Sequence, residues 1–499
     1  MSEILTNYFK NKRIINISVQ GKYTEDIPIN AKDIQKSIPQ TKGTGHIVFV
    51  VDTLSCDINA AFELTDWLLR NHYSWDTVVS GFSGSFGTVL SFGAQTIYLG
   101  TASFFMPIDA THPSHKYRFV IEVLGGSHHI SRGVNPDEIE GLKNFMAEVF
   151  KPQRVPNNLL NTIHKTVPKD LIDSSDVKTK DIQKKLLLLS KNKNLEATGK
   201  FISDLTENSG SFDHFVNGKD FSLTGSNIVL IPSEVQKAIE NSTPSFDPWK
   251  DLFLHLGNNE KEELYRHLSA LSSIRDSLIV PIPSTAPFSF DLVCKIRSFL
   301  SQNLGTNQEQ RKKLSFLLDS LGGNEPSAFL LSRVIKEFDP DFEVIVNRNA
   351  RSGSALFVIG SPKIYVRKNS LFSYFDPAVE DMCHPGKPIS ESALRRVFLS
   401  PNLSDRQKES LFEELLFHVN PLRLGQVFRA GKLLRRFTTI SLREKGIKEA
   451  EDIARSLTLN SFPHEYPLSV EEFSKISHLD LMPLDETSDN VINHISRFL

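Results

Sequence analysis

The sequence predicts an α/β protein built from two consecutive domains of one type. In both halves of the 499-residue chain, short apolar runs of strand length alternate with amphipathic helical segments. This alternation is typical of βαβ construction and a mostly parallel sheet. The first half also aligns on the second without a gap when Asp52 is set against Asp319, an offset of 267 residues. A repeat of that length indicates two large domains and excludes a solenoid of short units.

The internal repeat extends well beyond one segment. Residues 50–69 lie over residues 317–336, and a later stretch, 202–221, resembles 453–473 and sets His214 against His464. The 267-residue offset also brings six further pairs into register: Ser85 and Ser352, Gly93 and Gly360, Tyr98 and Tyr365, Ser103 and Ser370, Phe105 and Phe372, and Asp109 and Asp376. Residues 241–248 have the Ser/Pro composition of a linker. We therefore expect one domain over residues 1–243 and a second over residues 249–499.

The bulk composition excludes several classes of protein. With 39% hydrophobic and 23% charged residues, the chain has the make-up of an ordinary globular protein. A formal net charge of −2 argues against nucleic acid as a partner. The three cysteines lack metal-ligand spacing and indicate a reducing compartment. The N-terminal sequence lacks the apolar segment of a signal peptide, and no apolar run is long enough to span a membrane. We expect a cytoplasmic protein.

The apolar runs and their periodicity predict the individual elements. In the first half we expect strands at residues 13–18, 47–51, 77–80 and 96–99, with helices at 58–70, 85–94, 137–150, 181–194 and 195–207. A Gly/Ser turn is expected between the third strand and the helix at residue 85. In the second half we expect a helical leader at 249–273, strands at 277–280, 315–318 and 343–346, and helices ending near 337 and covering 411–417 and 422–436. Arg435 and Arg436 are interpreted as solvated surface.

Ser85 is the residue that points most directly to chemistry. It is predicted at the first turn of a helix, among unpaired backbone N–H groups and at the positive end of the helix dipole. That location favours developing negative charge, which an acyl-transfer nucleophile and its oxyanion require. Ser352 repeats the arrangement in the second half. The alternative is a small residue in a tight turn between a strand and a helix.

Three polar residue types recur in register and together form the minimal set for acyl transfer. They are the pairs Ser85 and Ser352 as nucleophiles, His214 and His464 as bases, and Asp109 and Asp376 as residues that orient the base. The alternative is that the aspartates cap helices or close turns and that the histidines are structural.

An oxyanion hole needs two backbone N–H groups beside the nucleophile. One would come from the residue after the serine, Phe86 or Gly353. The other would come from the turn after the preceding strand, which is Gly322-Gly323 in the second half and Ser55-Cys56 in the first. Glycine permits the positive φ and close approach that such a turn often needs, so the second half has the better-formed anion site.

Other chemistries fit the sequence less well. Four histidines, His112, His115, His128 and His129, lack the spacing of a metal site and are interpreted as exposed loop residues. No G-x-x-x-x-G-K-[ST] motif is present, so a P-loop is excluded. Residues 83–87 nearly match the G-x-S-x-G elbow of α/β-hydrolases, but the internal repeat argues against that fold. We expect neither a metal nor a cofactor.

Several segments resemble the serine dehydrogenase proteinase family. SGSFGT (83–88) and ARSGSA (350–355) resemble its A-K-S-A-G-T nucleophile segment, and LSCDINAA (54–61) resembles its T-P-G-G-D-x-x-A-A segment. MPID (106–109) resembles G-P-I-D, FPHEYPLSVEEF (462–473) resembles Y-x-x-H-x-x-P-I, and VNPLRLGQV (419–427) resembles the helix before it. That family is related to Clp protease and signal peptide peptidase A. The resemblance implies tandem duplicated ClpP/crotonase-like domains of stacked ββα units and a serine-type peptidase activity.

The departures from the family pattern leave the base open. The first half lacks the glycine pair and has Gly84 where the family has a basic residue, whereas the second keeps Arg351 but has Ser354 where a glycine is usual. The catalytic histidine of Clp proteases would fall near Ile108 and is absent. Signal peptide peptidases use a serine–lysine dyad, and Lys116 and Lys387 lie at suitable distances along the chain.

Two functions of different classes follow from these observations. The first is a cytoplasmic serine hydrolase that cleaves peptides or proteins through Ser352 and Ser85, within a chain that assembles into a homo-oligomer. The second is a catalytically inactive crotonase-like scaffold that binds a partner.

Overall fold

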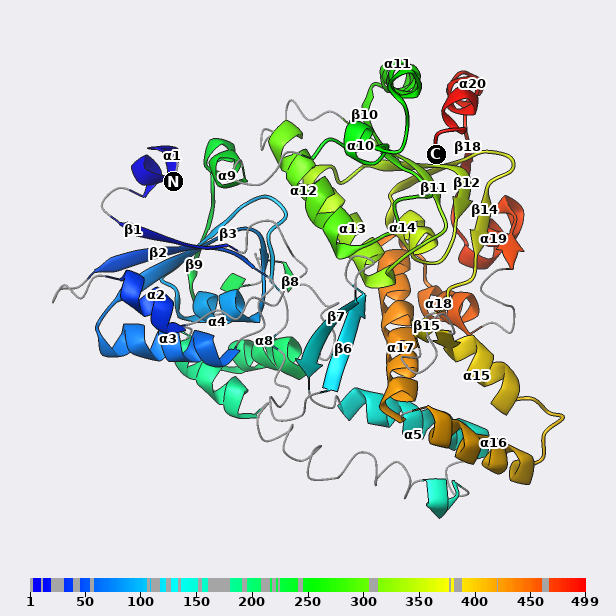
Figure 1. The fold of residues 1–499 in the computed structure, drawn as a ribbon, viewed down its shortest axis with the longest axis horizontal. Coiled ribbons are helices and arrows are strands. Elements are labelled where there is room, and N and C mark those ends of the chain that lie inside the picture. The colour runs from blue at the N-terminus through cyan, green and yellow to red at the C-terminus, as the bar shows by residue number, and fades with distance from the viewer. Residues whose placement is uncertain are drawn as a thin grey trace.

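The computed structural model describes residues 3–9, 12–18, 31–38, 45–53, 58–105, 108, 117–122, 127–132, 136–150, 155–159, 180–190, 195–207, 216–217, 221–222, 225–240, 246–304, 313–376, 378–380, 388–419, 421–459 and 466–499. They form a mixed α/β structure whose strands gather into two seven-stranded sheets and two short two-stranded sheets. The two large sheets lie on either side of the molecule (Figure 1).

The first large sheet runs in the order β1-β2-β3-β4-β9, with β5 paired to β3 and β8 paired to β5. The strands are β1 (Arg13–Ser18), β2 (His46–Thr53), β3 (Ser74–Ser83), β4 (Thr96–Leu99), β5 (Phe104–Phe105), β8 (Val216–Asn217) and β9 (Asn227–Leu230). All pairs are parallel except β5 with β8. The register of β2 on β3 shifts between Val51 and Thr53.

The second large sheet has the equivalent order, β10-β11-β12-β13-β18, with β14 paired to β12 and β17 paired to β14. Its strands are β10 (Ser277–Ile282), β11 (Lys313–Ser320), β12 (Glu343–Ala350), β13 (Lys363–Val366), β14 (Leu371–Ser373), β17 (Pro467–Leu468) and β18 (Met482–Pro483). Its pairs are parallel except β14 with β17. The register of β11 on β12 shifts between Leu318 and Ser320, at the position that matches the shift in the first sheet.

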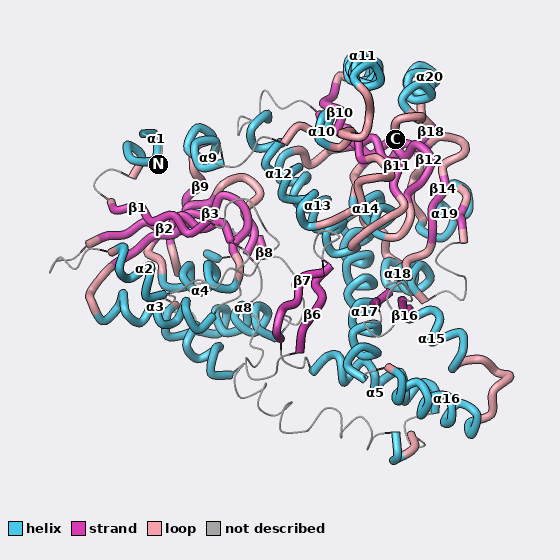
Figure 2. The backbone as a smooth tube through the Cα atoms, in the orientation of Figure 1, coloured by secondary structure: helices cyan, strands magenta, loops and turns pink. Residues whose placement is uncertain are grey.

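Helices make up most of the remaining structure, and Figure 2 shows them around both sheets. In the first half they are α1 (Glu3–Tyr8), α2 (Ala31–Ser37), α3 (Ile58–Arg70), α4 (Ser85–Gly93), α5 (Pro136–Phe150), α8 (Leu195–Glu207) and α9 (Ser233–Glu240). In the second half they are α10 (Pro248–Asp251), α11 (Asn258–Arg275), α12 (Phe290–Leu304), α13 (Glu325–Phe338), α14 (Gly353–Gly360), α15 (Glu391–Phe398), α16 (Asp405–His418), α17 (Pro421–Glu444), α18 (Ala450–Thr458), α19 (Val470–Ser477) and α20 (Glu486–Ile495). The short sheets are β6 (Tyr117–Glu122) with β7 (Ser127–Arg132), and β15 (Ala378–Glu380) with β16 (Pro388–Ser390).

Strands β2 and β11 are apolar on both faces because helices cover both faces of their sheets. In β2, Phe49 and Val51 pack into the core that α3, α4 and α8 share, whereas Val48 and Val50 pack against α1 and α9. Strand β11 repeats the pattern, with Leu317 facing α11 and α20. The continuous apolar runs in the sequence therefore reflect burial on both sides of each sheet.

The two halves share core residues. Phe82 and Phe104 of the first sheet belong to the same buried cluster as residues of α12 in the second half. Helix α5 packs with α15, α16 and α17 in another buried cluster (Figure 1). The side chain of Arg297 on α12 is buried, its Nη1 donates to the Ser80 carbonyl at 2.6 Å, and its guanidinium lies 5.7 Å from the Phe82 ring.

The structure corrects three of the sequence-based expectations. Strand β3 continues to Ser83, where a turn was expected from residue 81. A Cβ on Gly81 would lie 2.5 Å from Arg297 Nη2, so the glycine makes room for this arginine within the strand. The helical leader expected over residues 249–273 is divided into two helices, α10 and α11. Arg435 was expected at the solvated surface, but its Nη1 donates to the buried Glu391 carboxylate at 3.1 Å.

We predict that Arg297→Met lowers the free energy of unfolding by about 2–3 kcal/mol, because the buried Ser80 carbonyl loses a charged hydrogen-bond donor. Guanidinium titration followed by circular dichroism measures the change. Arg266 on α11 is exposed, and Arg266→Met is the matched control with an expected change within about 0.5 kcal/mol. Equal stability of the two variants would contradict the role assigned to Arg297.

Candidate active site

A glycine turn joins the carboxyl end of β11 to α13. Gly322 and Gly323 have φ values of +118° and +133°, a backbone region that other residues rarely adopt. A Cβ on Gly323 would lie 2.4 Å from the Phe288 amide nitrogen. A Cβ on Gly322 would lie 2.9 Å from the Cβ of Ser352. The turn therefore packs directly against this serine, and both positions require glycine.

Ser352 is the N-cap of α14 and has φ +48° and ψ −123°. For a residue with a side chain this conformation is strained by about 1–3 kcal/mol, and it persists only where the surroundings enforce it. The Ser352 amide donates to Ser373 Oγ at 3.0 Å, and its hydroxyl donates to Glu325 Oε1 at 2.7 Å. The residue is buried, with 6% of its surface exposed.

Two helices begin beside Ser352. Helix α13 begins at Glu325 and α14 at Gly353, and a Cβ on Gly353 would lie 2.9 Å from the Gly323 carbonyl oxygen. Within the residues that the structure describes, no acceptor contacts the amides of Gly323 or Gly353. Backbone N–H groups at helix N-termini favour negative charge. The arrangement is suited to an anion that develops next to the Ser352 hydroxyl.

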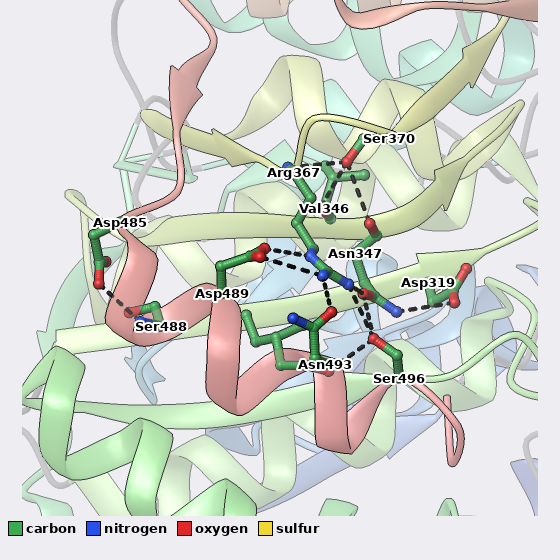
Figure 3. Close-up of polar contacts among 11 residues, drawn as sticks. Asp319, Val346, Asn347, Arg367, Ser370, Asp485, Ser488, Asp489, Asn493 and Ser496 are labelled. Atoms are coloured by element: carbon green, nitrogen blue, oxygen red, sulfur yellow. Dashed lines mark hydrogen bonds and ion pairs between the residues drawn. The ribbon is translucent and has the colours of Figure 1, made fainter.

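A buried carboxylate fixes the chain just before Ser352. Asp319, at the register shift of β11, is fully buried and accepts from Arg348 Nε at 2.6 Å and from the Asn349 amide at 3.2 Å. Asn347 Nδ2 also donates to Asp319, at 3.2 Å (Figure 3). These bonds hold the last residues of β12, just before Ser352, in one conformation.

The same network extends to the C-terminal helix. Arg367, directly after β13, donates from Nη1 to Asn347 Oδ1 at 2.8 Å and from Nε to Asp489 Oδ1 of α20 at 2.5 Å. Ser496 Oγ donates to the same Asn347 oxygen at 2.8 Å (Figure 3). Helix α20 is therefore tied through Asn347 to the segment that leads to Ser352.

The equivalent turn of the first half has a different backbone. Ser85 is the first residue of α4, and the N-cap is Gly84 with φ −67° and ψ 179°. The N-cap of α14, by contrast, is the serine itself. Phe86, the expected oxyanion donor, is a fully buried residue of α4. Ser55 and Cys56 lie outside the described residues.

The remaining predicted site residues are placed only in part. Asp376 is buried, and its carboxylate accepts from the hydroxyl and the amide of Ser392 at 2.5 and 3.2 Å. The structure does not bring Asp376 into contact with Ser352. Asp109, His214 and His464 lie outside the described residues, as do the alternative lysines, Lys116 and Lys387.

Sequence reasoning missed Glu325 and Ser373, which both bond to Ser352. A signal for Glu325 was present, because this carboxylate follows the Gly322-Gly323 turn after a single residue. Ser373 gave no such signal. It lies at the end of β14, where its Oγ donates to the Tyr374 carbonyl at 3.0 Å.

Comparison with known proteins gives no family assignment. No family model matches the chain. An uncharacterized protein of Methanocaldococcus jannaschii is 24% identical over 164 residues, which are 33% of this chain and 50% of that protein. The chain thus covers half the length of this curated relative. Among solved structures, a membrane-bound stomatin-specific protease with a substrate peptide aligns at a TM-score of 0.26 and 13% identity, over 42% of this chain and 75% of that one. No helix within the described ranges is long and apolar enough to cross a membrane.

We predict that Gly323→Ala lowers the free energy of unfolding by about 2–4 kcal/mol, because the added Cβ meets the Phe288 backbone and the backbone is strained for alanine. Gly199, within α8, is the control, since a Cβ there meets nothing within 4 Å. Gly199→Ala should raise stability by about 0.5–1 kcal/mol. Denaturant titration measures both changes, and a neutral Gly323→Ala would contradict the assigned turn geometry.

Proposed function

We propose that this chain is a serine peptidase-like hydrolase that cleaves peptide bonds in the cytoplasm, with Ser352 as the nucleophile. The observation that carries the proposal is the strained backbone of Ser352, held between the Gly322-Gly323 turn and the start of α14. Strained residues at helix starts are typical of nucleophiles that must be presented to a substrate.

The geometry supports a defined role for each backbone group. The Ser352 oxygen attacks the carbonyl carbon of the substrate, and the carbonyl oxygen becomes an oxyanion. The amides of Gly353 and Gly323 are the proposed donors to that oxyanion, a contribution typically of about 3–4 kcal/mol for one such donor. His464, the base expected from the sequence, lies outside the described residues, and Asp376, expected to orient that base, accepts from Ser392.

We also propose that residues 1–243 and 249–499 are tandem copies of one ClpP/crotonase-like domain. The equivalent strand orders support this, and so do recurring contacts. Phe105 stacks on Phe221 at 3.9 Å, and Phe372 stacks on Phe473 at 4.1 Å. On this proposal Ser85 is the counterpart of Ser352, with Asp109 and His214 as its partners. The different backbone at Ser85 favours the second copy as the active one.

A second candidate function is a catalytically inactive crotonase-like scaffold. One observation favours it: no histidine or lysine within the described ranges contacts the Ser352 hydroxyl. On this view the Ser352–Glu325 hydrogen bond is structural, and the tandem domains bind a partner protein.

A fluorophosphonate probe distinguishes the two candidates. We expect wild-type protein to be labelled stoichiometrically and Ser352→Ala to lose at least about 99% of the labelling, since only an activated serine reacts. Ser361→Ala is the matched control, because Ser361 is the buried C-cap of the same helix and should leave labelling unchanged. Absence of labelling in folded wild-type protein would favour the scaffold.

A further inference from the structure

The Glu325 carboxylate accepts a hydrogen bond from the Ser352 hydroxyl. The Oγ–Oε1 distance is 2.7 Å, within the range of about 2.6–3.2 Å that a general base requires. We propose that Glu325 is the general base of this site, so that the nucleophile works in a serine–glutamate pair. This inference rests on the proposed function, and it assigns the proton acceptor that the sequence left open.

A residue other than Glu325 caps the N-terminus of α13. Asn324 is the N-cap, and its Oδ1 accepts from the amide and hydroxyl of Ser327 at 2.9 and 2.7 Å. Glu325 follows as the first helical residue, and its Oε1 accepts from Ser352. A carboxylate in a first turn often serves the helix itself. Here the carboxylate reaches across to the start of a second helix.

The candidates for the base that the sequence offered, His214, His464, Lys116 and Lys387, lie outside the described residues. Asp376, which was expected to orient the base, accepts from Ser392. Among the described residues, Glu325 is the proton-accepting side chain that bonds to the Ser352 hydroxyl.

The proposed step balances in protons and bonds. As Ser352 Oγ forms its bond to the carbonyl carbon, its proton passes to Glu325 Oε1. The protonated Glu325 then gives this proton to the leaving amine nitrogen as the C–N bond breaks, which leaves an acyl-enzyme and a free amine. Water attacks the acyl carbon and loses a proton to Glu325. The bond between that carbon and Ser352 Oγ then breaks, Glu325 gives its proton to Oγ, and the carboxylic acid product leaves, which restores the site.

This assignment makes the reactivity of Ser352 depend on the carboxylate at position 325. With a glutamate base, the second-order rate of fluorophosphonate labelling at Ser352 should fall when this carboxylate is replaced by a group that accepts no proton. With a histidine or lysine base elsewhere, the rate should survive that replacement.

The test measures this rate from pH 4 to 9 on full-length protein, for wild type, Glu325→Gln, Glu325→Asp and a control. Glu325→Gln keeps the size of the side chain but accepts no proton, and should reduce the rate by about 10²–10⁴-fold. Glu325→Asp should recover part of the rate. Glu486 is also the first residue of a helix and is exposed, so Glu486→Gln should label like wild type.

Each outcome separates this inference from the proposed function. Labelling of Ser352 that survives Glu325→Gln overturns the glutamate base and leaves the hydrolase proposal standing. Failure to label folded wild-type protein at any pH overturns both. If Glu325→Gln does not fold, Glu325→Asp decides the matter, because its shorter carboxylate should slow the labelling, and an unchanged rate would overturn the glutamate base.

Discussion

The candidate site depends on one constraint, the conformation of the backbone at Ser352. A side chain at φ +48° is unfavourable on its own, so the surrounding structure must enforce it. The Gly322-Gly323 turn packs against Ser352, and the Ser373 hydroxyl oxygen accepts a hydrogen bond from the Ser352 amide. Under these restraints the hydroxyl faces Glu325, and the first amides of α14 lie beside it.

The contacts that support the backbone at Ser352 extend to other strands and helices of the second half. Asp319 orders the end of β12, and Arg367 ties that strand to α20 through Asn347. The polar network in Figure 3 is therefore part of the support for the site, although it contacts no reacting group. Charged groups buried in such networks are stable only when they are well paired, which explains why Asp319 accepts from Asn347, Arg348 and Asn349.

Local signals predicted much of the fold. Strands β1 and β4 and helices α3 and α8 have the bounds expected from apolar periodicity, because their burial follows directly from the local pattern. The end of β3 was misjudged because Gly81 makes room for Arg297, which is distant in sequence. The glycine turn at Gly322 was recognisable. The position of Glu325 just after this turn was a signal, but its bond to Ser352 is a contact between two helices that local sequence does not report.

The central claim is that this turn and the start of α14 form an oxyanion site for Ser352. The most direct measurement is a crystal structure of the protein after reaction with a fluorophosphonate. The account predicts a covalent bond to Ser352 Oγ, with the phosphoryl oxygen about 2.7–3.1 Å from the amide nitrogens of Gly353 and Gly323. An adduct whose phosphoryl oxygen points away from both amides, or an unmodified Ser352 in a folded crystal, would contradict it.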